Sequence, residues 1–135
     1  MRFMLDTNII IYLIKNKPES VAARVDLLNP NDDLVMSFVT YAELLKGAEN
    51  SSQKAKVLSN LEKLSQQIPV IYPVDAQICQ HYAVQFLKLK QSGSLIGAND
   101  LWIACHALAE QAVLVTHNVR EFQRIDGLVI EDWVE

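Results

Sequence analysis

The chain places polar side chains, four of them acidic, at or within about one helical turn of the ends of predicted strands and the starts of predicted helices. The residues concerned are Asp6, Glu43, Asp100, Asn118 and Glu121. Because functional sites of open α/β sheets form at the carboxyl ends of the strands, we expect these side chains to share one edge of a sheet. Carboxylates gathered at one edge repel one another unless a cation lies between them, and their hard oxygens suit Mg²⁺ or Mn²⁺. The pattern therefore predicts a divalent metal site.

Each acid also has an ordinary structural explanation. Asp6 can cap the helix that begins near Asn8, and Asp100 can cap the helix that follows it. Glu43 can be a solvated helix residue, although small and apolar neighbours surround it in YAELL. Glu121 can be a charge at a helix start, near Arg124. None of these acids is specific when it is considered alone.

Other chemistries find no support in the sequence. The segment Asp6-Thr7-Asn8 is neither the glycine-rich turn of a dinucleotide site nor a P-loop. None of the three histidines has the spacing of a zinc site. Cys79 and Cys105 both fall in amphipathic helical patterns, which predicts two buried thiols and no disulfide. The net charge of −4 does not indicate a general nucleic-acid binder.

The elements that must position the acids alternate between strand and helix. Predicted strands cover residues 2–5, 34–36, 113–115 and 128–130, and helical patterns fill most of the intervals between them. Residues 68–74 contain two prolines, which predicts a short strand or an edge segment there. This alternation predicts an α/β fold in which helices flank both faces of a parallel sheet. At 135 residues and 50% apolar content, we expect one domain over residues 1–135.

The sequence also predicts a cytoplasmic location. No apolar run approaches the roughly 20 residues needed to cross a bilayer. Asp6 and Asn8 would interrupt the apolar region of any secretory signal at the N-terminus.

Five segments, taken in order, resemble the PIN-domain ribonucleases, and specifically the VapC toxins of bacterial type II toxin-antitoxin pairs. These segments are FMLDTNIIIYLIK, SFVTYAELLKGA, IGANDLWIACHAL, LVTHNVREF and GLVIEDW, and they span nearly the whole chain. Matched position by position, Asp6, Glu43 and Asp100 correspond to the three central acids of that family. Asn118 stands where many PIN domains have a fourth Asp, and Glu121 matches the Glu of the pattern T-N-N-x-x-E-F. The fourth acidic role thus stays open between these two residues.

The resemblance implies a PIN-like three-layer α/β/α fold with a short parallel sheet, and an endoribonuclease that depends on Mg²⁺ or Mn²⁺. Asp6, Asp100 and Glu43 would hold the metal, which would activate water and leave 5′-phosphate and 3′-hydroxyl ends. Toxins of this type often cut a structured RNA such as initiator tRNA near its anticodon, which inhibits translation.

Partners are implied as well. The resemblance implies a VapB-type antitoxin whose C-terminal segment wraps the toxin and directs an Arg or Lys into the acids, and it implies a homodimer. We expect the dimer to bury apolar residues of the early helices, namely Ile10, Tyr12, Leu13 and Leu44. Candidate RNA contacts near the acids are Lys15, Lys17, Lys46, Arg120, Arg124, Thr7 and Thr116, and the basic residues among them can equally be ordinary solvated charges.

Two other functions fit part of the pattern. Phosphohydrolases of the haloacid-dehalogenase type also use Mg²⁺ and an Asp after the first strand, but they carry D-x-D there, and Asn8 cannot act as the general acid. A catalytically inactive partner-binding module would leave the acids dispersed in space. The arrangement of Asp6, Glu43 and Asp100 discriminates between this module and an enzyme.

Overall fold

A five-stranded parallel sheet forms the centre of the computed structural model, which describes residues 1–135. The strands lie in the order β3-β2-β1-β4-β5. Their bounds are β1 Arg2–Leu5, β2 Asp33–Ser37, β3 Val70–Ile71, β4 Val113–Val115 and β5 Ile130–Glu131. Strand β1 therefore lies in the middle of the sheet, and every connection between neighbouring strands passes through helices, as parallel pairing requires.

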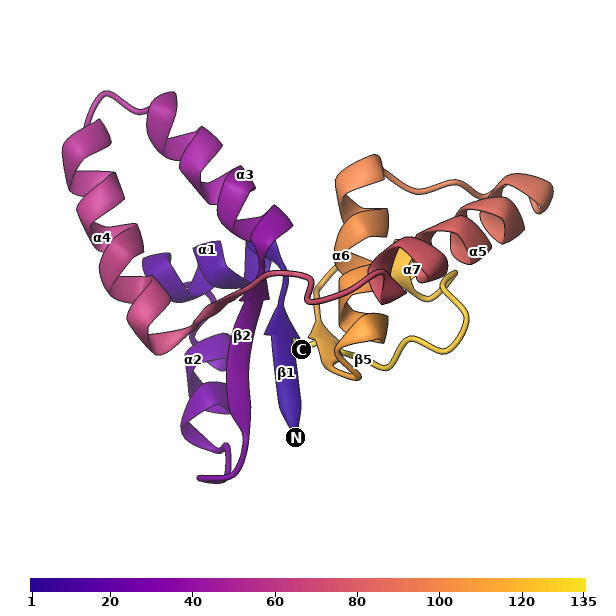
Figure 1. The fold of residues 1–135 in the computed structure, drawn as a ribbon. Helices are drawn as coiled ribbons and strands as arrows, with labels where there is room; N and C mark the ends of the chain where they lie inside the picture. Colours follow the sequence, from indigo (N-terminus) through magenta and orange to yellow (C-terminus); the bar gives the residue numbers. More distant parts are fainter.

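Helices cover both faces of this sheet (Figure 1). The bounds are α1 Thr7–Lys15, α2 Glu19–Asp26, α3 Phe38–Glu49, α4 Lys54–Gln67, α5 Gln77–Gln91, α6 Ala98–Ala109 and α7 Val119–Phe122. Buried residues of α1, α2 and α4 pack in one apolar cluster, and those of α5, α6 and α7 pack in a second cluster. Helix α3 contributes to both. The predicted three-layer α/β/α architecture is confirmed.

The alternation of side chains along β1 explains the two clusters. Phe3 and Leu5 point into the cluster of α1 and α2, whereas Met4 points into the cluster of α5 and α6. Successive residues of a strand face opposite sides of the sheet, so a central strand that is covered twice has no polar face. This accounts for the unbroken apolar run before Asp6.

The short edge strand expected within residues 68–74 is confirmed as Val70–Ile71, since the prolines on either side remove amide donors. Two other expectations require correction, and the first is the last strand, which is Ile130–Glu131 and not residues 128–130. Cys105 is buried as predicted, but Cys79 is exposed, because α5 turns that face to solvent.

The predicted dimer surface is also partly wrong. Ile10 is fully buried and Leu44 is 7% exposed within a single chain, so neither side chain is available to a second protomer. Both pack in the cluster of α1 and α2, because the pair α3 and α4 covers this side of the sheet. Tyr12 and Leu13 are only partly buried. None of the helices is both long enough and apolar enough to cross a membrane.

Candidate active site

Asp6 lies at the carboxyl end of the central strand and is the N-cap of α1. Its Oδ1 accepts a hydrogen bond from the Ile9 amide at 3.0 Å, so the capping role is confirmed. The side chain is only 6% exposed. Burial raises the pKa of Asp6 above its usual value, and the charge of Glu43 adds to the rise, while hydrogen bonds from the Thr116 side chain and the Ile9 amide oppose it. Asp6 is therefore both a helix cap and a buried acid that has a second acid nearby.

Glu43 reaches this acid from α3. The Thr7 hydroxyl donates to Glu43 Oε1, and Asn99 Nδ2 donates to Glu43 Oε2 at 3.5 Å. Thr7 follows Asp6 directly and Asn99 precedes Asp100, so residues adjacent to two other acids hold this carboxylate. Glu43 is thus part of a polar network and not a freely solvated helix residue.

Asp100 lies in the first turn of α6, where the helix dipole favours a negative charge. It is not the N-cap, because Gly97 takes that position. Its pKa is raised to about 6, first by burial and then by the charges of Asp6, Glu121 and Glu43. Four acids from four separate segments thus lie close enough to influence one another, which favours a shared site over the dispersed arrangement expected of an inactive module.

Asn118 and Glu121 differ in how they reach the site. Asn118 is the N-cap position of α7, and its amide donates to Thr116 Oγ1 at 3.0 Å. Its side chain forms no hydrogen bond in the structure. Glu121, one turn later, is among the charges that raise the pKa of Asp100. Thr116 directly follows β4 and is fully buried, and its side chain also forms a hydrogen bond with Asp6.

The acids suit a hard divalent cation. Mutual repulsion among carboxylates is what a bound cation removes, and all donors are oxygens. When one carboxylate oxygen is taken from each of any three of these acids, at least two of the three oxygens lie more than 4.8 Å apart. A cation held by Asp6, Glu43 and Asp100 would therefore draw at least one of these side chains inward.

A groove beside Glu43 opens along α3. It has a volume of about 610 Å³, and its walls are formed by residues none of which is hydrophobic, namely Thr7, Glu43, Lys46, Gly47, Glu49 and Asn50. Lys46 is thus the predicted basic residue that shares a cavity with one of the acids, and it is exposed and free of ion pairs. The groove is wide and polar, which suits a large charged substrate better than a small apolar one.

The other basic candidates lie elsewhere on the surface. Lys15 is the last residue of α1 and Lys17 follows that helix, so both are exposed away from its Asp6 end. Arg120 is exposed on α7. Arg124 donates through Nη1 to the carbonyls of Ser94 and Leu95, at 3.4 and 3.3 Å. These bonds tie Arg124 to the loop before α6, which favours a structural role for this side chain.

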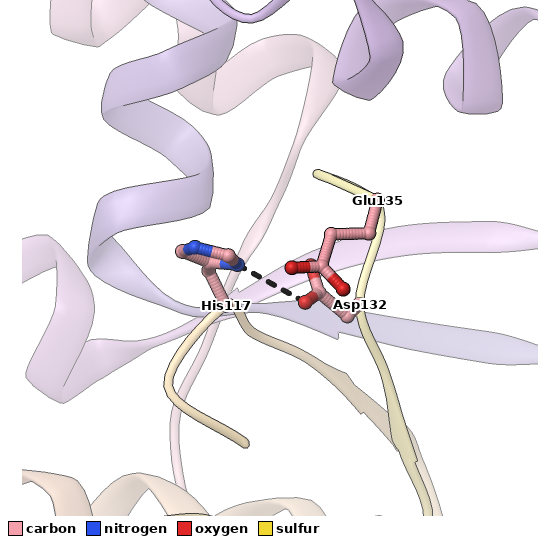
Figure 2. A group of neighbouring side chains, drawn as sticks. All are labelled: His117, Asp132 and Glu135. Carbon is pink, nitrogen blue, oxygen red and sulfur yellow. Dashed lines mark hydrogen bonds and ion pairs between the residues drawn. The ribbon is translucent and has the colours of Figure 1, made fainter. Parts of the chain in front are cut away.

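A second group of polar side chains extends the same edge of the sheet (Figure 2). His117 follows β4 and Asp132 follows β5, and His117 Nδ1 lies 3.0 Å from Asp132 Oδ2. One ligand atom from each of His117, Asp132 and Glu135 lies within 4.8 Å of the other two. The His117–Asp132 pair links the segment that carries Asn118 to the last residues of the chain.

Sequence reasoning missed three contributors to the site. Asn99 was not among the predicted site residues, and its bond to Glu43 depends on how α6 meets α3. The His117–Asp132 pair joins the ends of two neighbouring strands, for which no sequence spacing exists. His106 was not among the predicted site residues either, and it is a buried residue of α6 whose hydrogen-bond partner is Ser37. The signal for Asn99 was its place beside Asp100.

Known proteins resemble this chain over its whole length. The family model of the PIN domain matches residues 3–128. Ribonuclease VapC1 of Haemophilus influenzae strain R2866 is 56% identical over 135 residues, and the match covers 100% of both chains. The tRNA(fMet)-specific endonuclease VapC of Shigella flexneri is 40% identical over 133 residues and covers 98% of both.

Solved structures agree with the sequence matches. A structure of VapBC-1 from nontypeable Haemophilus influenzae superposes with a TM-score of 0.94 at 56% identity, over 100% of both chains. VapBC2 of Rickettsia felis, bound to a DNA fragment from its promoter, gives a TM-score of 0.90 at 38% identity, over 98% of this chain and 99% of the other. With its fold, its acids and these relatives taken together, the chain belongs to the PIN domain family and, within it, to the VapC ribonucleases.

Proposed function

We propose that this protein is a metal-dependent endoribonuclease toxin that cleaves a structured RNA, initiator tRNA in its anticodon region, and so inhibits translation. The carrying observation is that Asp6, Glu43, Asp100 and Glu121, from four separate segments, lie close together, with Thr7 and Asn99 joining Glu43 to the neighbours of the other acids. The substrate follows the name of the Shigella flexneri relative, a tRNA(fMet)-specific endonuclease. Such a substrate implies action in the cytoplasm, and we propose that residues 1–135 act as a single PIN domain.

In this proposal Asp6, Asp100 and Glu43 hold Mg²⁺ or Mn²⁺. The cation supplies a water of lowered pKa and offsets the charge that builds on the phosphodiester. The chain's own residues set the geometry. The Ile9 amide and the Thr116 side chain orient Asp6, and Thr7 and Asn99 orient Glu43. Their hydrogen bonds favour the charged forms that a cation requires.

We assign the fourth acidic role to Glu121 and not to Asn118. Glu121 carries a charge that acts on Asp100, whereas the uncharged Asn118 acts through its backbone at the start of α7. In this assignment Asn118 holds α7, and with it Glu121, against the buried Thr116. Thr116 thereby supports two of the acids.

In this proposal Lys46 makes the main contribution to binding phosphate. It lines the groove next to Glu43, where its ammonium group can attract a phosphate that the acids alone would repel. Arg120, on the short helix of Glu121, is the second candidate. Lys15, Lys17 and Arg124 lie outside this groove or are bound to a loop, so we expect smaller effects from them.

We also propose a VapB-type antitoxin as partner and a homodimer as the assembly. The solved relatives from Haemophilus influenzae and Rickettsia felis are VapBC structures, which supports a partner of this type. An Arg of the antitoxin that entered the acids would pair with carboxylates in place of the cation. A fully assembled toxin would then be inactive. The partly buried Tyr12 and Leu13 stay available to an interface, whereas Ile10 and Leu44 do not.

Cleavage of purified tRNA tests the proposed function. With Mn²⁺ or Mg²⁺ the wild-type protein should yield two fragments with 5′-phosphate and 3′-hydroxyl ends, and EDTA should stop the reaction. Asp6→Asn should lower kcat by at least about 100-fold with the fold intact by circular dichroism. Glu62→Gln, an exposed change on α4, is the matched control and should cleave like the wild type. Full activity of Asp6→Asn, or equal cleavage in EDTA, would contradict the mechanism.

A further inference from the structure

A buried hydrogen bond connects the helices that carry Glu43 and Asp100. Ser37, the N-cap of α3, lies with its Oγ 2.8 Å from Nδ1 of His106 on α6. Ser37 is fully buried and His106 is 1% exposed. Polar groups in an apolar core are costly unless they are hydrogen-bonded, so the two side chains depend on each other. The bond therefore fixes how α3 and α6 meet.

The neighbouring bonds define the proton positions. The Val39 amide donates to Ser37 Oγ, which leaves the hydroxyl proton free to donate to His106 Nδ1. The imidazole proton then lies on Nε2, which has no hydrogen-bond partner and lies 3.9 Å from Glu110 Oε1. His106 and Glu110 line a cavity of about 30 Å³, which has room for one bridging water. Burial lowers the pKa of His106 to about 4, so the ring is neutral at pH 7.

The two helices run antiparallel where they meet. Ser37 and Glu43 are six residues apart on α3, and Asp100 and His106 are six residues apart on α6. Six residues of helix span about 9 Å, so a bond between Ser37 and His106 brings Glu43 level with Asp100. The bond from Asn99 Nδ2 to Glu43 Oε2 marks this second level. Figure 1 shows α3 leaving the end of β2, where Ser37 lies.

We infer that Ser37 and His106 are positioning residues, which hold α3 and α6 in the register that sets Glu43 against Asp100. A slip of one residue would move an acid by about 1.5 Å along the helix axis and turn it away from its partner. Misplacement by about 1 Å can lower a reaction rate 100-fold. The consequence for catalysis rests on the proposed ribonuclease function, whereas the consequence for cation binding does not.

Substitutions at His106 test the inference. His106→Leu removes the bond to Ser37, and His106→Asn keeps an acceptor near the position of Nδ1. We expect His106→Leu to weaken Mn²⁺ binding at least about fivefold and to lower kcat about tenfold or more, with KM for tRNA unchanged within about twofold. His106→Asn should recover most of both losses. Free Mn²⁺ is followed by electron paramagnetic resonance, which requires no activity.

Gln85 offers a matched control. It is buried on α5 and exchanges two hydrogen bonds with the backbone of Asp126, and it forms no hydrogen bond with α3 or α6. Gln85→Leu should lower the melting temperature as His106→Leu does, but leave Mn²⁺ affinity and kcat unchanged. If His106→Leu does not fold, Ser37→Ala replaces it in the same comparison.

The outcomes separate the inference from the proposed function. Equal Mn²⁺ affinity and kcat in the folded His106→Leu and Gln85→Leu proteins would overturn the positioning role. Failure of His106→Asn to recover either quantity would also overturn it, because the bond to Ser37 would then not be the cause. A wild-type protein that binds Mn²⁺ but cleaves no RNA would contradict the proposed function, while the Mn²⁺ affinities would still decide the role of His106.

Discussion

Replacing Asp100 by Asn should stabilise the metal-free protein at neutral pH. Asp100 is half-buried beside Asp6, Glu43 and Glu121, and its pKa is raised to about 6. The folded chain therefore keeps this proton to a higher pH than the unfolded chain does. The contribution of Asp100 to the free energy of unfolding is fully present below pH 3.8 and is lost as the pH rises through 6. Asn carries no charge and avoids that loss.

The size of the effect follows from the pKa. A rise from 3.8 to about 6 corresponds to about 3 kcal/mol when Asp100 is fully ionised. Because the side chain is only half-buried, we expect solvent to screen part of this, leaving a gain of about 1 to 2 kcal/mol at pH 7.5. For a domain of this size the gain raises the melting temperature by about 3 to 8 °C. At pH 4.5 most of the gain should disappear.

Urea unfolding in EDTA at pH 7.5 and 4.5 measures this difference directly. Asp126→Asn is the control, since Asp126 is an exposed acid whose partner is Lys88, and it should change stability by less than about 0.5 kcal/mol. An Asp100→Asn protein that is no more stable than the wild type at pH 7.5 would refute the reasoning. A gain of equal size at both pH values would refute it too, because charge repulsion would then not be its source.

Three further predictions concern cations, protons and the fourth acid. Mn²⁺ at about 100 times its Kd should stabilise the wild type by about 2.7 kcal/mol and Asp6→Asn much less, as measured by thermal unfolding; equal shifts would mean binding elsewhere. The pKa of His106 falls to about 4 in the folded protein, so the unfolded chain takes up a proton on this residue at a higher pH than the folded chain does. In an Asp100→Asn background, the free energy of unfolding should therefore fall by up to about 3 kcal/mol between pH 6.5 and 4. A slope that persists in His106→Asn would contradict this assignment. Glu121→Gln should lower kcat more than Asn118→Ala in the tRNA assay, and the reverse order would return the fourth role to Asn118.

The positions of the acids were predictable because strand ends are visible in the sequence. Asp6 ends an apolar run, and Asp100 and Glu121 stand at the start of helical patterns, so their shared edge follows from the parallel sheet alone. For Glu43 the local signal was weaker, since only its small and apolar neighbours set this mid-helix acid apart, and the resemblance to known nucleases strengthened the prediction. Its partners Thr7 and Asn99 show afterwards why it belongs there.

Contacts between distant elements were not predictable from periodicity. A helical pattern shows which face of α1 or α3 is apolar, but not whether the chain itself or a second protomer covers that face. Ile10 and Leu44 were therefore assigned to an interface, although the chain buries both. The same limit applies to Cys79, which shares an apolar pattern yet lies on the exposed face of α5. The bond of Ser37 to His106 spans 69 residues and has no sequence signature at all.

The central place of β1 has a consequence for hydrogen exchange. The Asp6 amide donates to the Val115 carbonyl at 3.0 Å, and both clusters of apolar side chains clamp the strand before it. No partial opening frees this amide, so its exchange should report global unfolding only. Glu43 lies on a helix whose later turns pair with α4 along the edge of an open groove, where local opening costs less. The side of the acid site formed by β1 should therefore open only when the whole protein unfolds. The side formed by α3 can open locally while the rest of the protein stays folded.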